Sequence, residues 1–340
     1  MDQPEGTDFS SAARGALRYL RSRFGFDLWM VTRAEGDESI VLEAEGDRYG
    51  IVPYTSFKWA DSFCSRMAAG RAPRIAPDLA SIPAYASAGL GRGISIGAYI
   101  GVPLTYQDGA LFGTLCAFDS NPQPQAIEDD LPLVEMVAKM LSGVLAAELR
   151  AVNAERQKER NPTEAETDTL TDLLNRHGWD RMLQIEGERC RRYCNSAFVV
   201  LVDLDGLQKI NESLGQSAGD KLIRRTAKVL CKNVRETDVV ARLAGDKFGI
   251  LGIPGNPATA ELILGHIRKA LERAGIRASA GMAARVPALQ LGELWVEADQ
   301  QMYGEKTARK LRATAGNLRR ISRSQTFPLD SAFWPETGND

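Results

Sequence analysis

The first 125 residues alternate between β-rich segments and segments with helical periodicity. The runs DLWMVT and SIVLEAEG are apolar and β-rich, and the turn-like RAEGDE separates them. The segment WADSFCSRMAAG places Trp59, Phe63 and Met67 four residues apart and stops at a glycine, which is typical of a helix. The runs GAYIGVPLTY and ALFGTLCAFD flank the turn QDG and predict a β-hairpin. We therefore expect a compact antiparallel α+β domain over residues 1–125.

A single long helix is predicted next, from Glu128 to about residue 160. Apolar residues recur there at alternating four- and three-residue steps, as in a heptad seam. The seam consists of Leu133, Val137, Met140, Val144, Ala147 and Ala151, and it is widened by Leu141, Leu145 and Leu149. Since one helix cannot bury such a stripe alone, it either pairs with the same helix of a second chain, which we favour, or packs back on the first domain. We assign residues 126–162 to this signalling helix and linker.

A second α/β domain is predicted over residues 163–318. A helical segment precedes the buried strand AFVVLVDLDG, two helices follow around a glycine turn, and DVVARLAGDKFGILGI predicts a strand, a turn and a strand. A helix, a strand and a final helix ending near Ala313 complete the domain. Residues 319–340 are expected to form a tail. The expected fold class is therefore α/β (α+β), with two domains joined by a helix.

Composition and charge are those of an ordinary globular protein. Hydrophobic residues make up 44% of the chain and charged residues 25%, and the net charge of −2 gives no indication of nucleic-acid binding. No apolar run reaches the length of about 18 residues that a membrane segment needs, and the start shows no signal pattern. The five cysteines include no C-x-x-C pair, so we expect a reducing, cytoplasmic location. The presence of only two histidines argues against a Ser-His-Asp triad or a multi-histidine metal site.

Carboxylates gather at two predicted strand ends. Asp203 and Asp205 end the strand VVLVDLDG at alternate positions, which point to the same side while a strand continues. Asp246 lies at the tip of the predicted strand–turn–strand. If that hairpin lies beside the first strand, Asp203 and Asp246 face one another and need a hard divalent cation between them. The alternative is that they are solvated aspartates in turns.

Four ordered segments between residues 168 and 312 resemble GGDEF domains, the diguanylate cyclase family. DTLTDLLNRHG is similar to the opening D-x-L-T-x-L-x-N-R, and VDLDGLQKINESLGQSAGD to the D-x-D-x-F-K-x-x-N-D-x-x-G-H-x-x-G-D segment. RLAGDKFGIL stands where R-x-GG[DE]EF is expected, and EADQQMYGEKTARK resembles the closing A-D-x-A-L-Y-x-A-K-x-x-G-R. The first domain, through DSFCSRMAAGRAPRIAPDLASIPAYA and the later hairpin, resembles GAF sensor domains.

The GGDEF resemblance implies a nucleotidyl-cyclase-like fold and a specific reaction. In that family two GTP-loaded domains meet in a dimer, and each 3′-hydroxyl attacks the other α-phosphate to give cyclic di-GMP, with two Mg²⁺ (or Mn²⁺) ions neutralising the developing charge. Asp246, within the signature residues Gly245, Asp246 and Lys247, would also help to activate the 3′-hydroxyl. Carried over by motif, the metal ligands are Asp203, the Leu204 carbonyl and Asp246, the guanine-binding residues are Asn211 and Asp220, and the phosphate-binding residues are Lys306 and Lys310.

The signature itself departs from the family pattern at two positions. Ala244 replaces the first glycine, and a backbone with positive φ there would cost an alanine on the order of 1–2 kcal/mol. Lys247 replaces the usual glutamate and puts an ammonium where a carboxylate is expected beside the metals. Lys310 replaces the family's usual arginine, which keeps the charge but loses the bidentate fork.

The segment RETD has the R-x-x-D spacing of the family's product-binding inhibitory site. Arg235 and Asp238 lie at the matching register before the signature, and an arginine with a carboxylate suits the phosphate and guanine edge of cyclic di-GMP. Two functions therefore stay open. One is a GAF-regulated diguanylate cyclase, slowed by Lys247. The other is a catalytically degenerate GGDEF protein that acts as a receptor for cyclic di-GMP or GTP.

The ligand of the first domain is not identified by the sequence. We expect the GAYIGVPL hairpin and Cys64 to line its pocket. Cys64 is isolated in the sequence and is interpreted as a buried structural thiol, without a chromophore or redox role.

Overall fold

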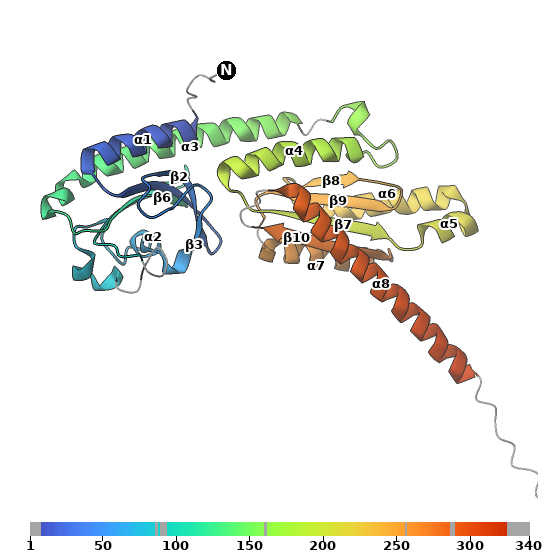
Figure 1. Cartoon of the computed structure of the whole chain (residues 1–340). Coiled ribbons are helices and arrows are strands. Elements are labelled where there is room, and N and C mark those ends of the chain that lie inside the picture. The colour runs from blue at the N-terminus through green and yellow to red at the C-terminus, as the bar shows by residue number, and fades with distance from the viewer. Residues whose placement is uncertain are drawn as a thin grey trace, which may run out of the picture.

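The computed structural model describes residues 8–85, 88, 94–159, 162–255, 257–285 and 290–324, and within these ranges the side chains of residues 157, 310 and 312–324 are not described. Two α/β domains lie side by side, and α1 and α3 run along the top of the first domain toward α4 of the second (Figure 1). Residues 325–340, most of the expected tail, lie outside the described residues. Short 3₁₀ helices are η1 (Trp59–Asp61), η2 (Leu79–Ser81), η3 (Pro83–Tyr85), η4 (Gln125–Asp130) and η5 (Glu164–Glu166).

The first domain is built on a six-stranded antiparallel sheet. Its strand order is β3-β2-β1-β6-β5-β4. The strands are β1 (Leu28–Glu35), β2 (Glu38–Glu45), β3 (Ser56–Lys58), β4 (Ile75–Ala76), β5 (Ala98–Thr105) and β6 (Leu111–Asp119). The predicted hairpin around QDG is the β5–β6 pair, in which Ala98 lies opposite Asp119. This bears out the antiparallel α+β architecture expected for the first domain.

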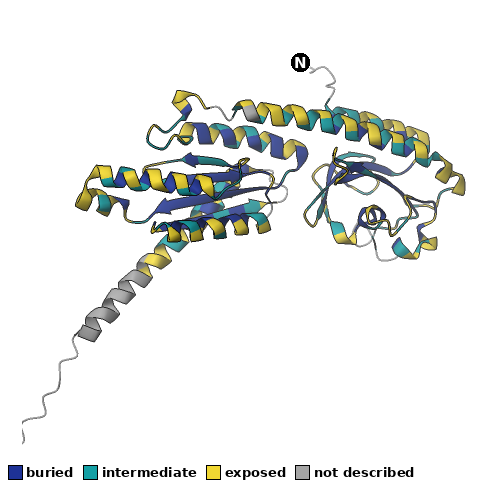
Figure 2. Cartoon of the chain, turned by 180° about the vertical axis from the view of Figure 1, so that it is seen from behind, coloured by how far each residue is buried: buried dark blue, intermediate teal, exposed yellow. Residues whose placement is uncertain are grey.

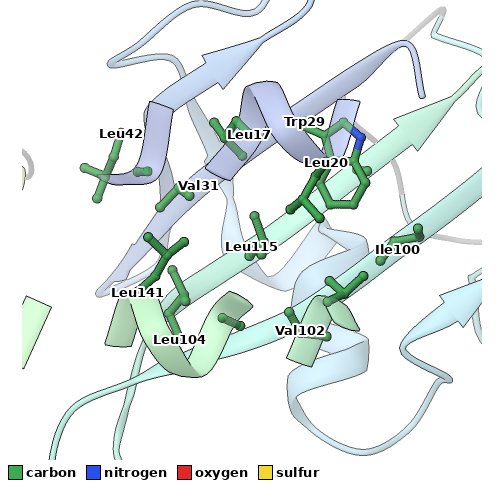
Figure 3. Packing of buried hydrophobic residues seen from close by; sticks show 14 of the residues in the cluster. Leu17, Leu20, Trp29, Val31, Leu42, Ile100, Val102, Leu104, Leu115 and Leu141 are labelled. Carbon is green, nitrogen blue, oxygen red and sulfur yellow. The ribbon is translucent and has the colours of Figure 1, made fainter. Parts of the chain in front are cut away.

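Each face of this sheet carries its own core, because successive side chains of a strand point to opposite faces. Trp29 and Val31 pack with the helices α1 (Phe9–Phe24) and α3 (Leu131–Glu159), as Figure 3 shows from close by. Leu28 and Met30, from the same strand, pack on the other face with α2 (Phe63–Ala68). Figure 2 shows the resulting pattern, with buried strands inside and exposed outer faces on the helices.

The helix α3 packs on the first domain with one stripe of its surface. Val134, Ala138, Leu141 and Leu145 are buried in the core that contains Trp29. Of the predicted heptad seam, Val137 and Val144 pack partly against the same core, whereas Met140 is 65% exposed. Within the single chain, α3 therefore packs back on the first domain through the buried residues that lie beside the predicted seam. Pairing with a second chain through the outer face stays a prediction.

The second domain has a four-stranded antiparallel sheet with the order β10-β7-β9-β8. Its strands are β7 (Ala197–Leu204), β8 (Val239–Arg242), β9 (Lys247–Gly252) and β10 (Ala278–Arg285). Its helices are α4 (Arg176–Tyr193), α5 (Leu207–Leu214), α6 (Gln216–Lys232), α7 (Pro257–Arg273) and α8 (Leu291–Ser324). The core that contains Phe198 and Val200 includes residues of α6 and α7, and the core on the other face includes residues of α4 and α8. The last helix continues to Ser324, beyond the end near Ala313 that the sequence predicts.

The two domains touch directly, in addition to being joined by α3. Nη1 of Arg33, a buried residue of β1, donates to the carbonyl of Tyr193 at 3.0 Å. Ser196 Oγ donates to Glu35 Oε1 at 2.6 Å, and Cys194 is buried within the core of the first domain. These contacts fix the start of β7 against the end of β1.

Ion pairs hold the second half of α3 against α4. Arg156 makes a two-bond pair with Glu186, at 2.9 and 2.6 Å, and Arg189 does the same with Glu159, at 2.7 and 3.0 Å. The exposed fractions of the Glu186 and Arg189 side chains are 6% and 10%, so these pairs are shielded from solvent. Among the described residues, no helix combines the length and apolar character that crossing a bilayer needs.

Candidate functional site

The carboxylates of Asp203 and Asp246 are brought together by the pairing of β7 with β9. Asp203 lies near the end of β7, opposite Lys247, the first residue of β9. The backbone N–H of Leu204 donates to the carbonyl of Asp246 at 2.9 Å, which anchors the hairpin tip to the end of β7. The structure therefore places the tip aspartate beside the strand-end aspartate, as the sequence predicts, and Asp246 is not a turn residue remote from the other acid.

Asp203 is buried and is paired with a lysine of α8. Lys306 Nζ lies 2.6 Å from Asp203 Oδ1, and the Asp203 side chain is 4% exposed. The pKa of Asp203 is raised above its ordinary value mainly by burial, which outweighs the hydrogen bond from Lys306, and the charge of Asp246 raises it further. Burial acts to lower the pKa of Lys306, but the hydrogen bond and charge of Asp203 raise it overall. The site thus holds two neighbouring acids and one firmly protonated amine.

Lys247 is directed toward α8. Its Nζ lies 3.4 Å from Oδ1 of Asp299, and the side chains of the two residues are 39% and 42% exposed. A pair this exposed is weak, so the lysine can exchange this partner for another at little cost. Asp299 belongs to the EADQQMY segment, and no sequence signal indicated that it would become the partner of Lys247.

Ala244 carries no backbone strain. In the part of the chain that the structure describes, the non-glycine residues with positive φ are Tyr54, Asp172 and Cys194, and Ala244 is not one of them. The expected cost of replacing the first signature glycine was therefore wrong, because the hairpin tip does not adopt the left-handed conformation there. The neighbouring Gly245 also has no positive φ, and a Cβ added to it would meet open space.

The predicted guanine-binding residues lie on two consecutive helices that are joined by a short turn. Asn211 is on α5 and Asp220 on α6, and the turn between the helices is made at Gly215, whose φ is 84°. A Cβ at Gly219 would come within 1.9 Å of Asn211 Oδ1, so glycine is what allows the asparagine side chain to lie against α6 beside Asp220. Asn211 thus lies against the helix that carries Asp220, and guanine binding by the two residues stays a prediction.

Asp205 does not share the partners of Asp203. It accepts a hydrogen bond from Ser279 Oγ at 3.0 Å and an ion pair from Arg309 Nη1 at 3.2 Å. β7 ends at Leu204, so the rule that alternate residues share one side no longer applies at Asp205. Its contacts attach the end of β7 to β10 and α8.

The oxygen donors of the site fit a hard divalent cation. Asp203 and Asp246 are close enough for the charge of one to shift the pKa of the other, and carboxylates and carbonyls are the ligands that Mg²⁺ prefers. Within the described residues, no group of three or more acidic, cysteine or histidine side chains is arranged as a metal cage. A cation here would therefore rely on phosphate oxygens to complete its shell. The side chain of Lys310, predicted to hold a terminal phosphate, lies outside the described residues.

Arg235 and Asp238 form a closely bonded pair at the start of β8. Arg235 donates through Nε and its backbone N–H to the Asp238 carboxylate at 3.0 and 2.9 Å, and through Nη1 to the carbonyl of Pro254 at 3.0 Å. The guanidinium also lies 5.7 Å from the centre of the Phe198 ring. Both residues line a pocket of about 320 Å³ next to the end of α3. The pair is therefore preformed, with much of the arginine fork already engaged within the chain.

Comparisons with known proteins match both halves of the chain. The model described as GAF domain matches residues 8–145, and the model described as diguanylate cyclase, GGDEF domain, matches residues 165–312. The probable diguanylate cyclase DgcC of Escherichia coli K12 is 28% identical over 207 residues, which are 58% of this chain and 55% of that protein. The diguanylate cyclase DgcS of Shewanella oneidensis is 28% identical over 147 residues, 42% of this chain and 49% of that protein.

Solved structures match the second half of the chain. The crystal structure of a sensory box/GGDEF family protein from Caulobacter crescentus is 29% identical, with a TM-score of 0.38, and the match covers 42% of this chain and 99% of that one. The chain spans about half the length of the curated relatives described above.

Proposed function

Because this chain consists of a GAF domain followed by a GGDEF domain, we propose that it is a cyclic di-GMP signalling protein whose second domain slowly converts two GTP to cyclic di-GMP. The observation that carries this proposal is the junction of Asp203 and Asp246 at the end of β7, with the ammonium of Lys247 turned to Asp299. Lys247 thus has a partner outside the carboxylate pair, and the ammonium that occupies Asp203 is that of Lys306.

Each retained residue has a defined task in this proposal. Asn211 and Asp220 bind the guanine edge, and Lys306 leaves Asp203 to pair with the terminal phosphates. Asp203, Asp246 and the Leu204 carbonyl would hold Mg²⁺, which supplies charge neutralisation at the phosphates. Asp246 also orients the 3′-hydroxyl and accepts its proton. Because each product molecule joins two GTP, two domains must face each other, which requires a dimer.

The experiment is incubation of the purified full chain with GTP and Mg²⁺ or Mn²⁺, followed by chromatography for cyclic di-GMP. Asp246→Ala is the inactive reference, and Asp180→Ala, which removes an exposed aspartate paired with Arg176 on α4, is the matched control. We expect product from the wild type and the control but not from the reference. If the folded wild type makes no more product than Asp246→Ala with either metal, the enzymatic proposal fails.

A second function, a cyclic di-GMP receptor, is favoured by the Arg235–Asp238 pair. The pair lines a pocket that also includes Glu159 of α3, so a ligand there would contact the signalling helix and the GGDEF domain together. The Nη2 atom of Arg235 is buried without a well-aligned hydrogen bond, although it lies 2.8 Å from Asp238 Oδ1. The Arg235 side chain as a whole is 38% exposed, so a ligand phosphate can reach part of its guanidinium. Calorimetry with cyclic di-GMP on the wild type and on Arg235→Ala tests this function independently of turnover.

A further inference from the structure

Two cysteines that are far apart in the sequence meet inside the first domain. Cys64 is on α2 and Cys116 is on β6, and the two residues are 3% and 0% exposed. The hydroxyl oxygen of Thr114 lies 3.2 Å from the Cys64 sulfur and 3.7 Å from the Cys116 sulfur. The expected burial of Cys64 is confirmed, and the sheet places a second thiol under the helix that carries it, which the isolated position of Cys64 in the sequence did not indicate.

Polar groups surround this thiol pair within an otherwise aromatic core. Tyr99 donates its hydroxyl to the Cys64 sulfur at 3.5 Å, and Thr32 lies 2.8 Å from Thr114 through their hydroxyl oxygens. A Cβ at Gly101, which faces Cys116 across the β5–β6 pair, would come within 1.8 Å of the Tyr99 hydroxyl. Glycine at that position is thus what lets the tyrosine hydroxyl reach the thiols. Hydroxyls that donate hydrogen bonds to a buried sulfur favour its thiolate form over the neutral thiol.

The two thiols differ in acidity. The pKa of Cys64 is lowered, chiefly by a hydrogen bond from the Cys116 thiol, and the hydroxyls of Thr114 and Tyr99 add to this effect against burial. The pKa of Cys116 is raised well above its ordinary value, chiefly by burial and then by its bond to Cys64. Cys64 is therefore the more acidic of two adjacent thiols, as an attacking cysteine beside a resolving cysteine would be.

We propose that Cys64 and Cys116 are a modification site, a dithiol that a hydroperoxide oxidises to a disulfide linking α2 to β6. In the first step, the Cys64 sulfur attacks one peroxide oxygen, the O–O bond breaks, and the product is a sulfenic acid with release of water or alcohol. In the second step, the Cys116 sulfur attacks the sulfenic sulfur, the S–O bond breaks, and the departing hydroxide takes the Cys116 proton as water. Two thiols lose two electrons, and the peroxide gains them.

The other cysteines provide internal controls. Cys190 and Cys194 are also buried and are one helical turn apart, but burial raises their pKa values to about 12 and about 11. Cys231 is an exposed residue, but partial burial of its sulfur raises the pKa of the thiol. Burial thus raises the pKa at all three of these positions, whereas the pKa of Cys64 is lowered.

The disulfide would change the packing of α2 on the face of the GAF sheet that this helix covers. A disulfide requires a sulfur–sulfur distance of about 2 Å, so α2 has to move toward β6 when the bond forms. Phe63, next to Cys64, stacks on Tyr99 with a ring separation of 5.6 Å, so this movement would disturb the aromatic core on that face.

The test uses the full-length chain. The reduced protein is treated with hydrogen peroxide, the remaining thiols are alkylated after denaturation, and a non-reducing digest is analysed by mass spectrometry. We expect a cross-linked peptide pair that contains Cys64 and Cys116, a loss of two hydrogen atoms per chain, and reversal by dithiothreitol. We also expect Cys190 and Cys194 to remain reduced at doses that oxidise the pair completely. A Cys64 that stays reduced, or that becomes sulfenic or sulfinic acid without the cross-link, would overturn the proposal.

Two variants sharpen the result. Thr114→Val removes the hydroxyl that contacts both sulfurs with little change in volume, and we expect it to slow disulfide formation on the order of tenfold by lowering the thiolate fraction. Cys231→Ser is the control and should leave the rate unchanged. If Thr114→Val folds and oxidises as fast as the wild type, the polar cluster does not activate Cys64. The mapping on the wild type decides the cross-link itself even where a variant fails to fold.

Discussion

Lys306 Nζ lies 2.6 Å from Oδ1 of Asp203, so a residue predicted to bind phosphate forms an ion pair with a residue predicted to bind metal. The pair closes the end of β7 against α8 and neutralises a buried carboxylate within the chain. Under the proposed function, nucleotide binding would exchange partners: Lys306 would pair with phosphate, and Asp203 would bind the cation.

We predict that Asp203→Asn stabilises the nucleotide-free protein while removing metal-dependent GTP binding. Because the folded-state pKa of Asp203 is raised above 3.8, ionising this carboxyl costs stability once the pH exceeds its unfolded-state pKa. The cost is absent below that pKa and complete above the folded-state pKa. The melting temperature of the variant should therefore exceed that of the wild type at neutral pH and equal it near pH 3. Thermal unfolding monitored across pH checks this, and an equal or lower melting temperature at neutral pH contradicts it.

We predict that Lys247→Glu raises cyclase activity, or creates it where it is absent. At about 5 Å from a divalent ion and an effective dielectric constant of about 20, one unit of charge is worth roughly 7 kcal/mol before screening. A third of that exceeds tenfold in metal affinity, so we expect product formation to rise by at least about tenfold. Chromatography of the reaction mixture measures the change, with Lys247→Met as a variant that loses only the positive charge.

The Lys247→Glu result needs one structural control. The new carboxylate would face Asp299, so the double variant Lys247→Glu with Asp299→Asn separates repulsion on α8 from the effect at the metals. Lys247→Glu protein with the wild-type fold, wild-type metal binding and no more product would count against the prediction.

We predict that the GTP and cyclic di-GMP sites can be separated by mutation. Asp246→Ala should lower the metal-dependent part of GTP affinity and abolish turnover, and it should leave cyclic di-GMP binding unchanged. Arg235→Ala should do the reverse, because Arg235 bonds to Asp238 and Pro254, not to the residues around Asp246. Calorimetry with both nucleotides on both variants measures the four affinities. If Asp246→Ala leaves GTP affinity and its metal dependence unchanged, the hairpin has only a structural role. If Arg235→Ala leaves cyclic di-GMP affinity unchanged, the receptor function loses its support.

We predict that α3 mediates a dimer. Val137 and Val144 of the seam are partly engaged in the GAF core, so glutamates there would also damage the fold. Met136 and Met140 are 53% and 65% exposed, which makes Met136→Glu with Met140→Glu the sharper test. Light scattering of the full chain should show a dimer for the wild type and a weaker one for the double variant. A wild-type chain that stays monomeric at high concentration would contradict this prediction.

The sequence predicted the backbone framework of the site better than its side-chain pairs. The approach of Asp246 to Asp203 follows from a strand pattern and a hairpin, which are local signals. The pairs of Lys247 with Asp299 and of Lys306 with Asp203 depend on where α8 crosses the sheet, and periodicity gives no rotation or height for a helix relative to a distant strand. For the same reason, the meeting of Cys64 with Cys116 was missed: α2 and β6 are separate elements whose contact is set only by packing.

The burial of Cys194 in the first domain's core has a consequence for how the chain unfolds. Cys194 follows α4, in the second domain, yet it is packed among the residues that hold α1 and α3 on the first sheet, next to the bond from Arg33 to Tyr193. Opening either domain therefore strips apolar contacts from the other. The two sequence domains should melt as one cooperative unit, and cutting the chain between them should leave each half less stable than it is within the whole.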